Sequence, residues 1–207
     1  MSFVGTSRAS SSTSSRSSDD ASCASDAGAA PLMHGAACPR ISSPFEKISC
    51  LGEGGFGDVW LARCRSSGLH VALKEVPRVQ ADARRLWLER AVLSEVSEAR
   101  HQGEASTVSP ALVGLVASFA TPFAVCLAMD LVEGATLNEH VRAAPTRSLP
   151  EAQARWYVAE IAGALDWLHG CSWLYRDLKM TNVLVCSKTG RVKLVDFGFA
   201  RRGTHVG

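Results

Sequence analysis

The chain is 207 residues long, which allows one good hydrophobic core or two small lobes. Its formal net charge of +2 is nearly balanced, so the charge gives no indication of binding to nucleic acid or to an anionic membrane. Seven cysteines are scattered without a C-x-x-C pair or zinc-ligand spacing, which predicts reduced thiols and excludes a disulfide framework.

The N-terminal segment is dominated by serine, which accounts for eleven of the first twenty-five residues. Such a composition cannot bury enough apolar surface to offset the entropy lost on ordering, so residues 1–43 are expected to be disordered. The segment is interpreted as a passive solvated extension, with a phosphorylated regulatory tail as the alternative. It has no apolar signal core and no glycine at position 2, so we expect an intracellular, cytoplasmic location.

A glycine-rich hairpin is predicted next. A strand over Phe45–Leu51 leads into the Gly-x-Gly-x-x-Gly run of residues 52–57, and a second strand follows through Arg63. A dinucleotide-binding loop needs a helix after its third glycine, whereas a strand follows here. Glycine lets backbone N–H groups approach phosphate oxygens closely, so we expect a hairpin folded over phosphates, with Val59 against an adenine ring.

A third strand, Leu69–Val76, carries Lys74 in the sequence Val-Ala-Leu-Lys. A helix is predicted over residues 81–100. One face of this helix collects Leu86, Glu89, Leu93 and Val96. A carboxylate on an apolar stripe needs a cationic partner, so Glu89 is predicted to pair with Lys74. Glu95 is the alternative partner, but it lies off the stripe.

Residues 107–129 contain no charged side chain, which meets the length criterion for a membrane span. Pro110, Gly114 and Pro122 interrupt the run, however, and its halves have the length of strands. Two strands, Ala111–Phe119 and Ala124–Asp130, are therefore favoured over a span.

Residues 129–134 look like the connector between two lobes, whose backbone groups would hydrogen-bond adenine. A short helix should begin over Thr136–Val141. Ser148-Leu149-Pro150-Glu151 has the pattern of a capping box, which predicts a long helix through His169 with Gly170 as its stop signal. Four residues of this helix are predicted to face the core: Tyr157, Ile161, Leu165 and Leu168.

The loop Tyr175–Asn182 carries three separable chemical roles. Asp177 can accept a proton from an attacking hydroxyl, Lys179 can neutralise charge on a moving phosphoryl group, and Asn182 can help hold a divalent metal. A second carboxylate, Asp196, precedes Phe197 and Gly198. The strands Val183–Cys186 and Arg191–Val195 should form a hairpin between the two carboxylates. Alone, Arg-Asp-Leu-Lys could equally be four charged residues on a surface turn, but the ordered partners upstream weaken that interpretation.

Residues 45–207, with these motifs in this order, resemble the first part of a eukaryotic-type protein kinase domain. Tyr175 in the place of the usual His, together with Asp-Phe-Gly-Phe-Ala from Asp196, is similar to the AGC group of Ser/Thr kinases, and especially to the cyclic-nucleotide-dependent kinases. Lys179 is similar to the pattern of Ser/Thr rather than Tyr kinases.

The resemblance implies an α+β, protein-kinase-like two-lobe fold. An N-lobe with an antiparallel sheet and a helix C would cover about 44–130, a hinge about 130–134, and a partial, mainly helical C-lobe 135–207. A regulatory spine is implied at Leu93, Leu115, Tyr175 and Phe197. A second set is implied to close around adenine, namely Val59, Ala72, Leu137 and Leu184.

The resemblance also implies the site residues, with ATP and Mg²⁺ as cofactors. Catalytic roles fall to Asp177, Lys179, Lys74 and Glu89, and metal binding to Asn182 and Asp196. Nucleotide binding falls to Leu51, Gly52, Glu53, Gly54, Gly55, Phe56, Gly57, Val59, Ala72, Lys74, Met129, Asp130, Val132 and Leu184. The implied partners are a protein substrate bearing Ser or Thr, and an upstream kinase or regulatory subunit.

Three departures from the family pattern stand out. Met180 and Thr181 replace a common Pro-Glu, and Thr136 replaces an acidic residue that contacts basic substrates, so a preference for basic peptides is not carried over. The sequence stops where an activation segment should begin, so we expect a truncated kinase domain. An ATP-binding, non-catalytic module is therefore the alternative function, and a small-molecule kinase of related fold is a less favoured third.

Overall fold

The computed structural model describes residues 43–54, 57–104 and 107–203. Gly55 and Phe56 of the glycine-rich run lie outside the described residues, as does all of the Ser-rich segment except Ser43. The disorder expected over residues 1–43 therefore stays a prediction.

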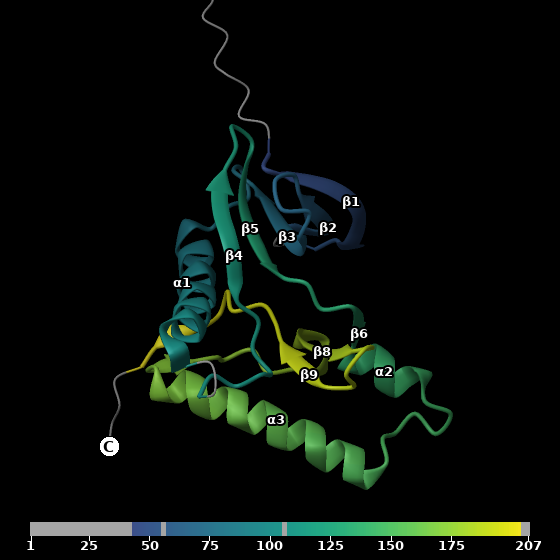
Figure 1. Ribbon diagram of the computed structural model, residues 1–207. Coiled ribbons are helices and arrows are strands. Elements are labelled where there is room, and N and C mark those ends of the chain that lie inside the picture. The colour runs from purple at the N-terminus through teal and green to yellow at the C-terminus, as the bar shows by residue number, and fades with distance from the viewer. Residues whose placement is uncertain (1–42, 55–56, 105–106, 204–207) are drawn as a thin grey trace, which may run out of the picture. The chain divides into compact units, whose positions relative to one another are not determined.

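The first half of the described chain forms a five-stranded antiparallel sheet in the order β1-β2-β3-β5-β4 (Figure 1). The strands are β1 (Phe45–Gly52), β2 (Asp58–Cys64), β3 (His70–Pro77), β4 (Leu115–Ala120) and β5 (Ala124–Asp130). Alternation along β3 sends Val71 and Leu73 into a small core with Phe45. Lys74 consequently lies on the opposite face of the sheet.

The strand expected over Ala111–Phe119 is wrong at its start, because β4 begins only at Leu115. Distant side chains occupy the backbone groups just before it. Arg100 donates to the Leu112 carbonyl, and the Gly114 N–H donates to the Asp130 carboxylate. No helix in the described part of the chain combines the length and apolar character needed to cross a bilayer.

Helix α1 (Ala83–Ala99) packs beside β4 (Figure 1). The Asp82 carboxylate caps its first turn by accepting hydrogen bonds from the backbone N–H groups of Arg84 and Arg85. All four members of the predicted stripe are buried, namely Leu86, Glu89, Leu93 and Val96. A π-helical turn, η1 (Arg100–Glu104), follows α1 directly.

The second half of the described chain combines two helices with a three-stranded sheet and a two-stranded sheet. Its elements are β6 (Gly134–Thr136), α2 (Leu137–Ala143), α3 (Glu151–Gly170), β7 (Trp173–Leu174), the 3₁₀ turn η2 (Met180–Asn182), β8 (Val183–Cys186), β9 (Val192–Leu194) and β10 (Arg201–Arg202). β8 pairs with β6 and β9, and β10 pairs with β7. Helix α3 packs along β9 (Figure 1). The predicted hairpin before Asp196 is therefore present as β8 and β9.

The predicted capping box at the start of α3 is wrong. The N-cap is Pro150, which has no side-chain donor or acceptor, and no side chain caps the helix. The Ser148 hydroxyl instead donates to Thr146 within the preceding loop. Proline fixes φ near the value that the chain needs at this point, so α3 starts without a polar cap.

One larger core joins α1, α3 and the β8–β9 hairpin. From α3, Tyr157 and Leu168 are fully buried in it, and Ile161 and Leu165 pack against it, in agreement with the predicted face. These contacts hold the two loops that carry Asp177 and Asp196 on a common base.

Candidate active site

The lysine of β3 and the glutamate of α1 form a buried ion pair. Lys74 Nζ donates to both carboxylate oxygens of Glu89, at 2.8 and 2.7 Å. The same nitrogen lies 3.5 Å from Asp196 Oδ1. Lys74 is 7% exposed and Glu89 2%, so water screens the pair little. The predicted pairing of these two residues is confirmed.

Burial sets the electrostatics of this pair. Desolvation raises the pKa of Glu89, and the Lys74 ammonium offsets the effect only in part. The negative charge of Asp196 raises the pKa of Glu89 further. Glu89 therefore relies on Lys74 to keep its charge.

Glu95, the alternative partner for Lys74, has a different position. Its Oε2 accepts hydrogen bonds from Trp173 Nε1 at 2.7 Å and from Arg202 Nη2 at 2.9 Å. The Arg202 guanidinium also lies over the Trp173 ring, 4.5 Å from its centroid. Because Trp173 is only 1% exposed, its N–H needs this acceptor. Glu95 thus anchors α1 to β7 and β10.

The loop after β7 brings Asp177, Lys179 and Asn182 together. Asp177 Oδ2 accepts hydrogen bonds from Lys179 Nζ at 2.8 Å and from Asn182 Nδ2 at 2.7 Å. Burial opposes ionisation of Asp177, but these hydrogen bonds and the charge of Lys179 outweigh it, so the pKa of this carboxyl is lowered. Arg176 adopts a left-handed backbone with φ of 69°, which a non-glycine residue adopts at a cost. The conformation of the loop around Arg176 is therefore held by contacts with neighbouring residues.

Asp196 also has a left-handed backbone, with φ of 59°. Its Oδ1 accepts the Gly198 N–H at 3.3 Å. Just before it, the Val195 carbonyl accepts a hydrogen bond from the Tyr175 hydroxyl at 2.6 Å, and burial raises the pKa of that hydroxyl. The Tyr175 and Phe197 rings meet edge to face, with centroids 5.6 Å apart. Leu93, Tyr175 and Phe197 share one core, against which Leu115 packs.

The glycines of the glycine-rich hairpin fall into two groups, one that the fold requires and one that it does not. Gly57 has a φ of 104°, and a Cβ there would lie 2.5 Å from the Glu75 carbonyl oxygen, so the fold itself requires glycine. At Gly52 a Cβ would meet nothing within 4 Å, and at Gly54 only the Gly57 carbonyl oxygen at 3.8 Å. Both are exposed. The packing of the described residues therefore gives no reason for these two glycines, whereas the close approach of a ligand would.

The residues predicted to surround adenine come from four elements. Val59 lies on β2, Ala72 on β3, Leu137 at the start of α2 and Leu184 on β8, and all are half-buried. Ala72 pairs directly with Met129 across β3 and β5, and Leu184 pairs with Thr136 across β8 and β6. Leu51 and Glu53 are exposed at the hairpin, and Asp130 and Val132 are half-buried at the connector.

The donor set suits a divalent cation held jointly with phosphate. Asn182 uses its amide nitrogen on Asp177, which points to its amide oxygen as the atom for a cation. Asp196 contributes a carboxylate beside Lys74. The described residues contain no group of three or more His, Cys, Asp or Glu placed for a metal. Mg²⁺ usually binds by one or two carboxylates plus phosphates, so Asp196 and Asn182 could hold it together with the oxygens of a nucleotide.

Arg85 also lies at this site, although no sequence motif indicated it. Its guanidinium lies over the Phe199 ring at 3.8 Å from the centroid, and its charge contributes to the low pKa of Asp177. A Cβ at Gly198 would lie 2.7 Å from Arg85 Nε. Arg85 precedes Glu89 by one helical turn. This i, i+4 spacing is the sequence feature from which its position near Glu89 could have been predicted.

Comparison with known proteins gives a consistent result. A family model described as "Protein kinase domain" matches residues 45–206. The chain is 36% identical over 164 residues to serine/threonine-protein kinase Sgk3 of Rattus norvegicus, covering 79% of this chain and 31% of that protein. It is 35% identical over 165 residues to protein kinase C zeta type of Oryctolagus cuniculus, covering 79% of this chain and 26% of that protein. It thus spans under a third of these relatives, which are Ser/Thr kinases of the predicted AGC group.

Proposed function

Because the chain belongs to the protein kinase domain family, matched over residues 45–206, we propose that it transfers the γ-phosphoryl group of ATP to Ser or Thr hydroxyls of protein substrates. The observation that carries the proposal is a pair of side-chain groups whose loops are joined by the hydrogen bond from the Val195 N–H to the Asn182 carbonyl, at 3.1 Å. One is the buried Lys74–Glu89 pair with Asp196 at 3.5 Å, and the other is Asp177 with Lys179 and Asn182 on its carboxylate. The α+β fold class is the one expected for this family.

Each residue has a distinct role in the proposed reaction. Mg²⁺-bound ATP supplies the phosphoryl group and part of the charge neutralisation, with Asn182 and Asp196 as the metal-binding residues. Lys74, oriented by Glu89, would hold the α- and β-phosphates, and Lys179 would stabilise negative charge near the acceptor. The catalysis then comes mainly from positioning and electrostatics.

Asp177 would orient the acceptor hydroxyl and take its proton. The hydrogen bonds from Lys179 and Asn182 to the carboxylate both use Oδ2. The low pKa keeps Asp177 ionised at neutral pH. Oδ1 can therefore accept a hydrogen bond from a substrate hydroxyl while Oδ2 fixes the orientation of the carboxylate.

The organisation of the whole protein is also part of the proposal. The N-lobe would extend over about 44–130, the hinge over about 130–134 and the described part of the C-lobe from 135, after a disordered tail. The proposed partners are protein substrates and an upstream kinase or regulatory subunit, in the cytoplasm. Thr136 supports no preference for basic peptides, because its hydroxyl is engaged with Glu139 in a capping box.

The test combines nucleotide binding with phosphotransfer on the full 207-residue chain. A ligand at about 100 times its Kd stabilises the folded state by about 2.7 kcal/mol, so Mg²⁺ and ATP should raise the melting temperature. Lys74→Ala should abolish this shift, whereas Arg142→Ala, at an exposed arginine of α2, should preserve it.

Transfer of labelled phosphate to Ser/Thr peptides then tests the chemistry. Asp177→Asn should abolish transfer while the thermal shift remains, and Asp166→Asn, an exposed aspartate on α3, should leave both unchanged. A shift without transfer in the wild type would support the non-catalytic, ATP-binding alternative. Full transfer by Asp177→Asn would refute the role of Asp177.

A further inference from the structure

The junction between α1 and the connector has an unusual concentration of directed hydrogen bonds. Arg100 caps the C-terminal end of α1. Its Nη1 donates to Asp130 Oδ2 at 2.8 Å, and its Nη2 donates to the Leu112 carbonyl at 2.9 Å. Asp130 is the last residue of β5, where the chain enters the connector. We call Arg100, Leu112, Gly114 and Asp130 the Arg100 junction.

Two hydrogen bonds join Asp130 and Gly114, and each residue donates one of them. The Gly114 N–H donates to Asp130 Oδ2 at 2.8 Å, and the Asp130 N–H donates to the Gly114 carbonyl at 3.1 Å. Arg100 donates to the same carboxylate oxygen, so one oxygen joins three segments of chain. A charge-assisted bond of this kind is about twice as strong as a neutral one. The backbone of Asp130 is therefore fixed from two sides.

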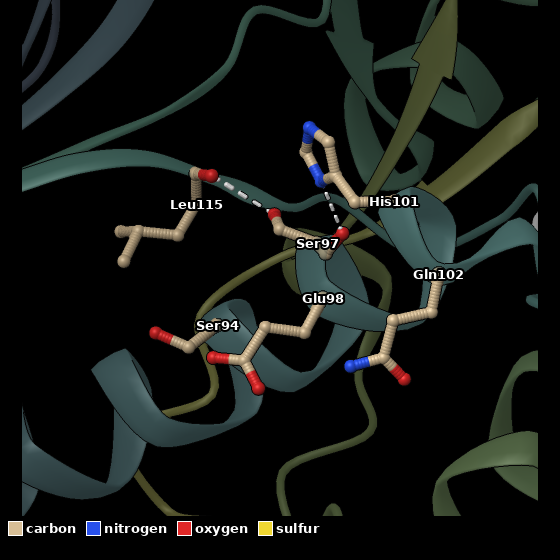
Figure 2. A pocket seen from close by; sticks show the side chains of 6 residues that line it. All are labelled: Ser94, Ser97, Glu98, His101, Gln102 and Leu115. Atoms are coloured by element: carbon tan, nitrogen blue, oxygen red, sulfur yellow. Dashed lines mark hydrogen bonds between the residues drawn. The ribbon is translucent and has the colours of Figure 1, made fainter.

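Gly114 has no room for a side chain. A Cβ there would lie 2.5 Å from Ser97 Oγ and 3.1 Å from Arg100 Nη1. The Ser97 hydroxyl is itself directed at the Leu115 carbonyl, 2.9 Å away, beside the pocket at this end of α1 (Figure 2). Close packing of Gly114 against α1 is thus a condition for the Arg100 junction.

The junction is continuous with the strand that leads to Asp196. Lys193 Nζ on β9 donates to the Pro110 carbonyl and, at 3.5 Å, to the Leu112 carbonyl that also binds Arg100. Leu112 forms a bridge to Leu194, whose N–H donates to the Ala111 carbonyl at 2.7 Å. Residues 110–114 therefore contact α1, the connector and β9 at one place.

We propose that Arg100 is a positioning residue for nucleotide binding, which fixes the backbone of Asp130 so that the connector presents its hydrogen-bonding groups to adenine. This inference rests on the proposed function, because it assumes that the connector binds the base. Arg100 touches no nucleotide in this scheme. Its removal should weaken binding of nucleotide in ground state and transition state alike, which raises KM for ATP and leaves kcat nearly unchanged.

The first measurement is the Kd of the full chain for a non-hydrolysable ATP analogue with Mg²⁺, by calorimetry. Arg100→Met and Gly114→Ala should each weaken binding about tenfold, a size typical of substitutions that act through a neighbouring segment. Combining them should add little, because both break the same junction. Arg90→Met is the matched control, since Arg90 also lies on α1 and bonds Ser118 of β4, and it should keep the wild-type Kd.

The second measurement is amide hydrogen exchange at Gly114 and Asp130 without nucleotide, which should accelerate in Arg100→Met and not in Arg90→Met. Wild-type affinity in both Arg100→Met and Gly114→Ala would overturn the inference. If the wild type binds no nucleotide, the proposed function fails. The role of Arg100 in fixing Asp130 is then tested by exchange alone, and unchanged amide exchange at Gly114 and Asp130 in Arg100→Met would refute it. Should Arg100→Met not fold, Asp130→Asn replaces it, with an expected loss of about threefold, and unchanged affinity there has the same meaning.

Discussion

At the scale of single residues, the buried ammonium of Lys74 is stabilised by two carboxylates, those of Glu89 and Asp196. Glu89→Leu should destabilise the fold by about 3 kcal/mol, because it leaves the ammonium buried with only Asp196 at 3.5 Å. Adding Lys74→Met should restore most of that stability, since an apolar pair replaces the ion pair. Urea unfolding measures the difference, and both variants should lack phosphotransfer. Equal destabilisation by the single and double variants would contradict this account.

Asp177 provides the test of pH dependence. Burial opposes its ionisation, but the hydrogen bonds from Lys179 and Asn182 lower its pKa below the usual 3.8. The ionised carboxylate of Asp177 therefore stabilises the folded state at pH values above 3.8. This stabilisation is lost as the pH falls through the lower pKa that Asp177 has in the folded state. Lys179→Met removes one of these bonds, so the pKa of Asp177 should rise.

The pH profile of kcat/KM measures this change in Asp177. Because the ionised carboxylate is the proposed active form, the acid limb should move to higher pH in Lys179→Met. Arg142→Met, at an exposed arginine of α2, provides the control and should leave the limb in place. An unmoved limb in Lys179→Met would show that this lysine does not tune Asp177.

At the scale of elements, the two long helices begin in different ways. Asp82 caps α1 with two hydrogen bonds, so Asp82→Ala should lower the free energy of unfolding by about 1 kcal/mol. Ser148 caps nothing, so Ser148→Ala at the start of α3 should change it by less than about 0.5 kcal/mol. Chemical denaturation of both variants makes the comparison. A larger loss in Ser148→Ala would contradict the uncapped start of α3.

The elements also show which information the sequence contains. The strands around Lys74, the buried stripe of α1 and the β8–β9 hairpin follow from local periodicity and turn residues, and these were predictable. The early part of β4 was not, because its backbone groups are taken by Arg100 and Asp130, which are distant in sequence. The cap of α3 was mispredicted for a different reason: Pro150 satisfied the local geometry without the serine that the pattern indicated.

At the scale of the whole molecule, α3 exposes large apolar side chains. Trp156 is 57% exposed and Val158 64%, and exposed apolar groups of this size promote association. Trp156→Arg should therefore reduce concentration-dependent light scattering without lowering the melting temperature. Ala152→Arg, at another exposed position of α3, adds the same charge and keeps the tryptophan. An equal reduction in that control would assign the effect to charge alone.

Assembly of the site from distant segments limits what a sequence can predict. The pairing of Lys74 with Glu89 was predictable, because a carboxylate on an apolar stripe needs a partner. The positions of Arg85, Glu95 and Arg100 depend on which segments meet around α1, and Arg100 in particular has partners at Leu112 and Asp130. Residue type and spacing therefore predicted the reactive residues of the candidate site. The residues that hold them in position could be identified only from the structure.

The Glu95 anchor has a consequence for the order of events during biosynthesis. Glu95 and Arg202 are 107 residues apart in sequence. At about 5–20 residues per second, a ribosome needs about 5 to 20 s to make the chain between them. During that interval α1 can meet the sheet and, once β7 is made, Trp173, which is 78 residues from Glu95, but it lacks its bond to Arg202 of β10. The helix that carries Glu89 therefore acquires its last contact only after the strand leading to Asp196 has been translated.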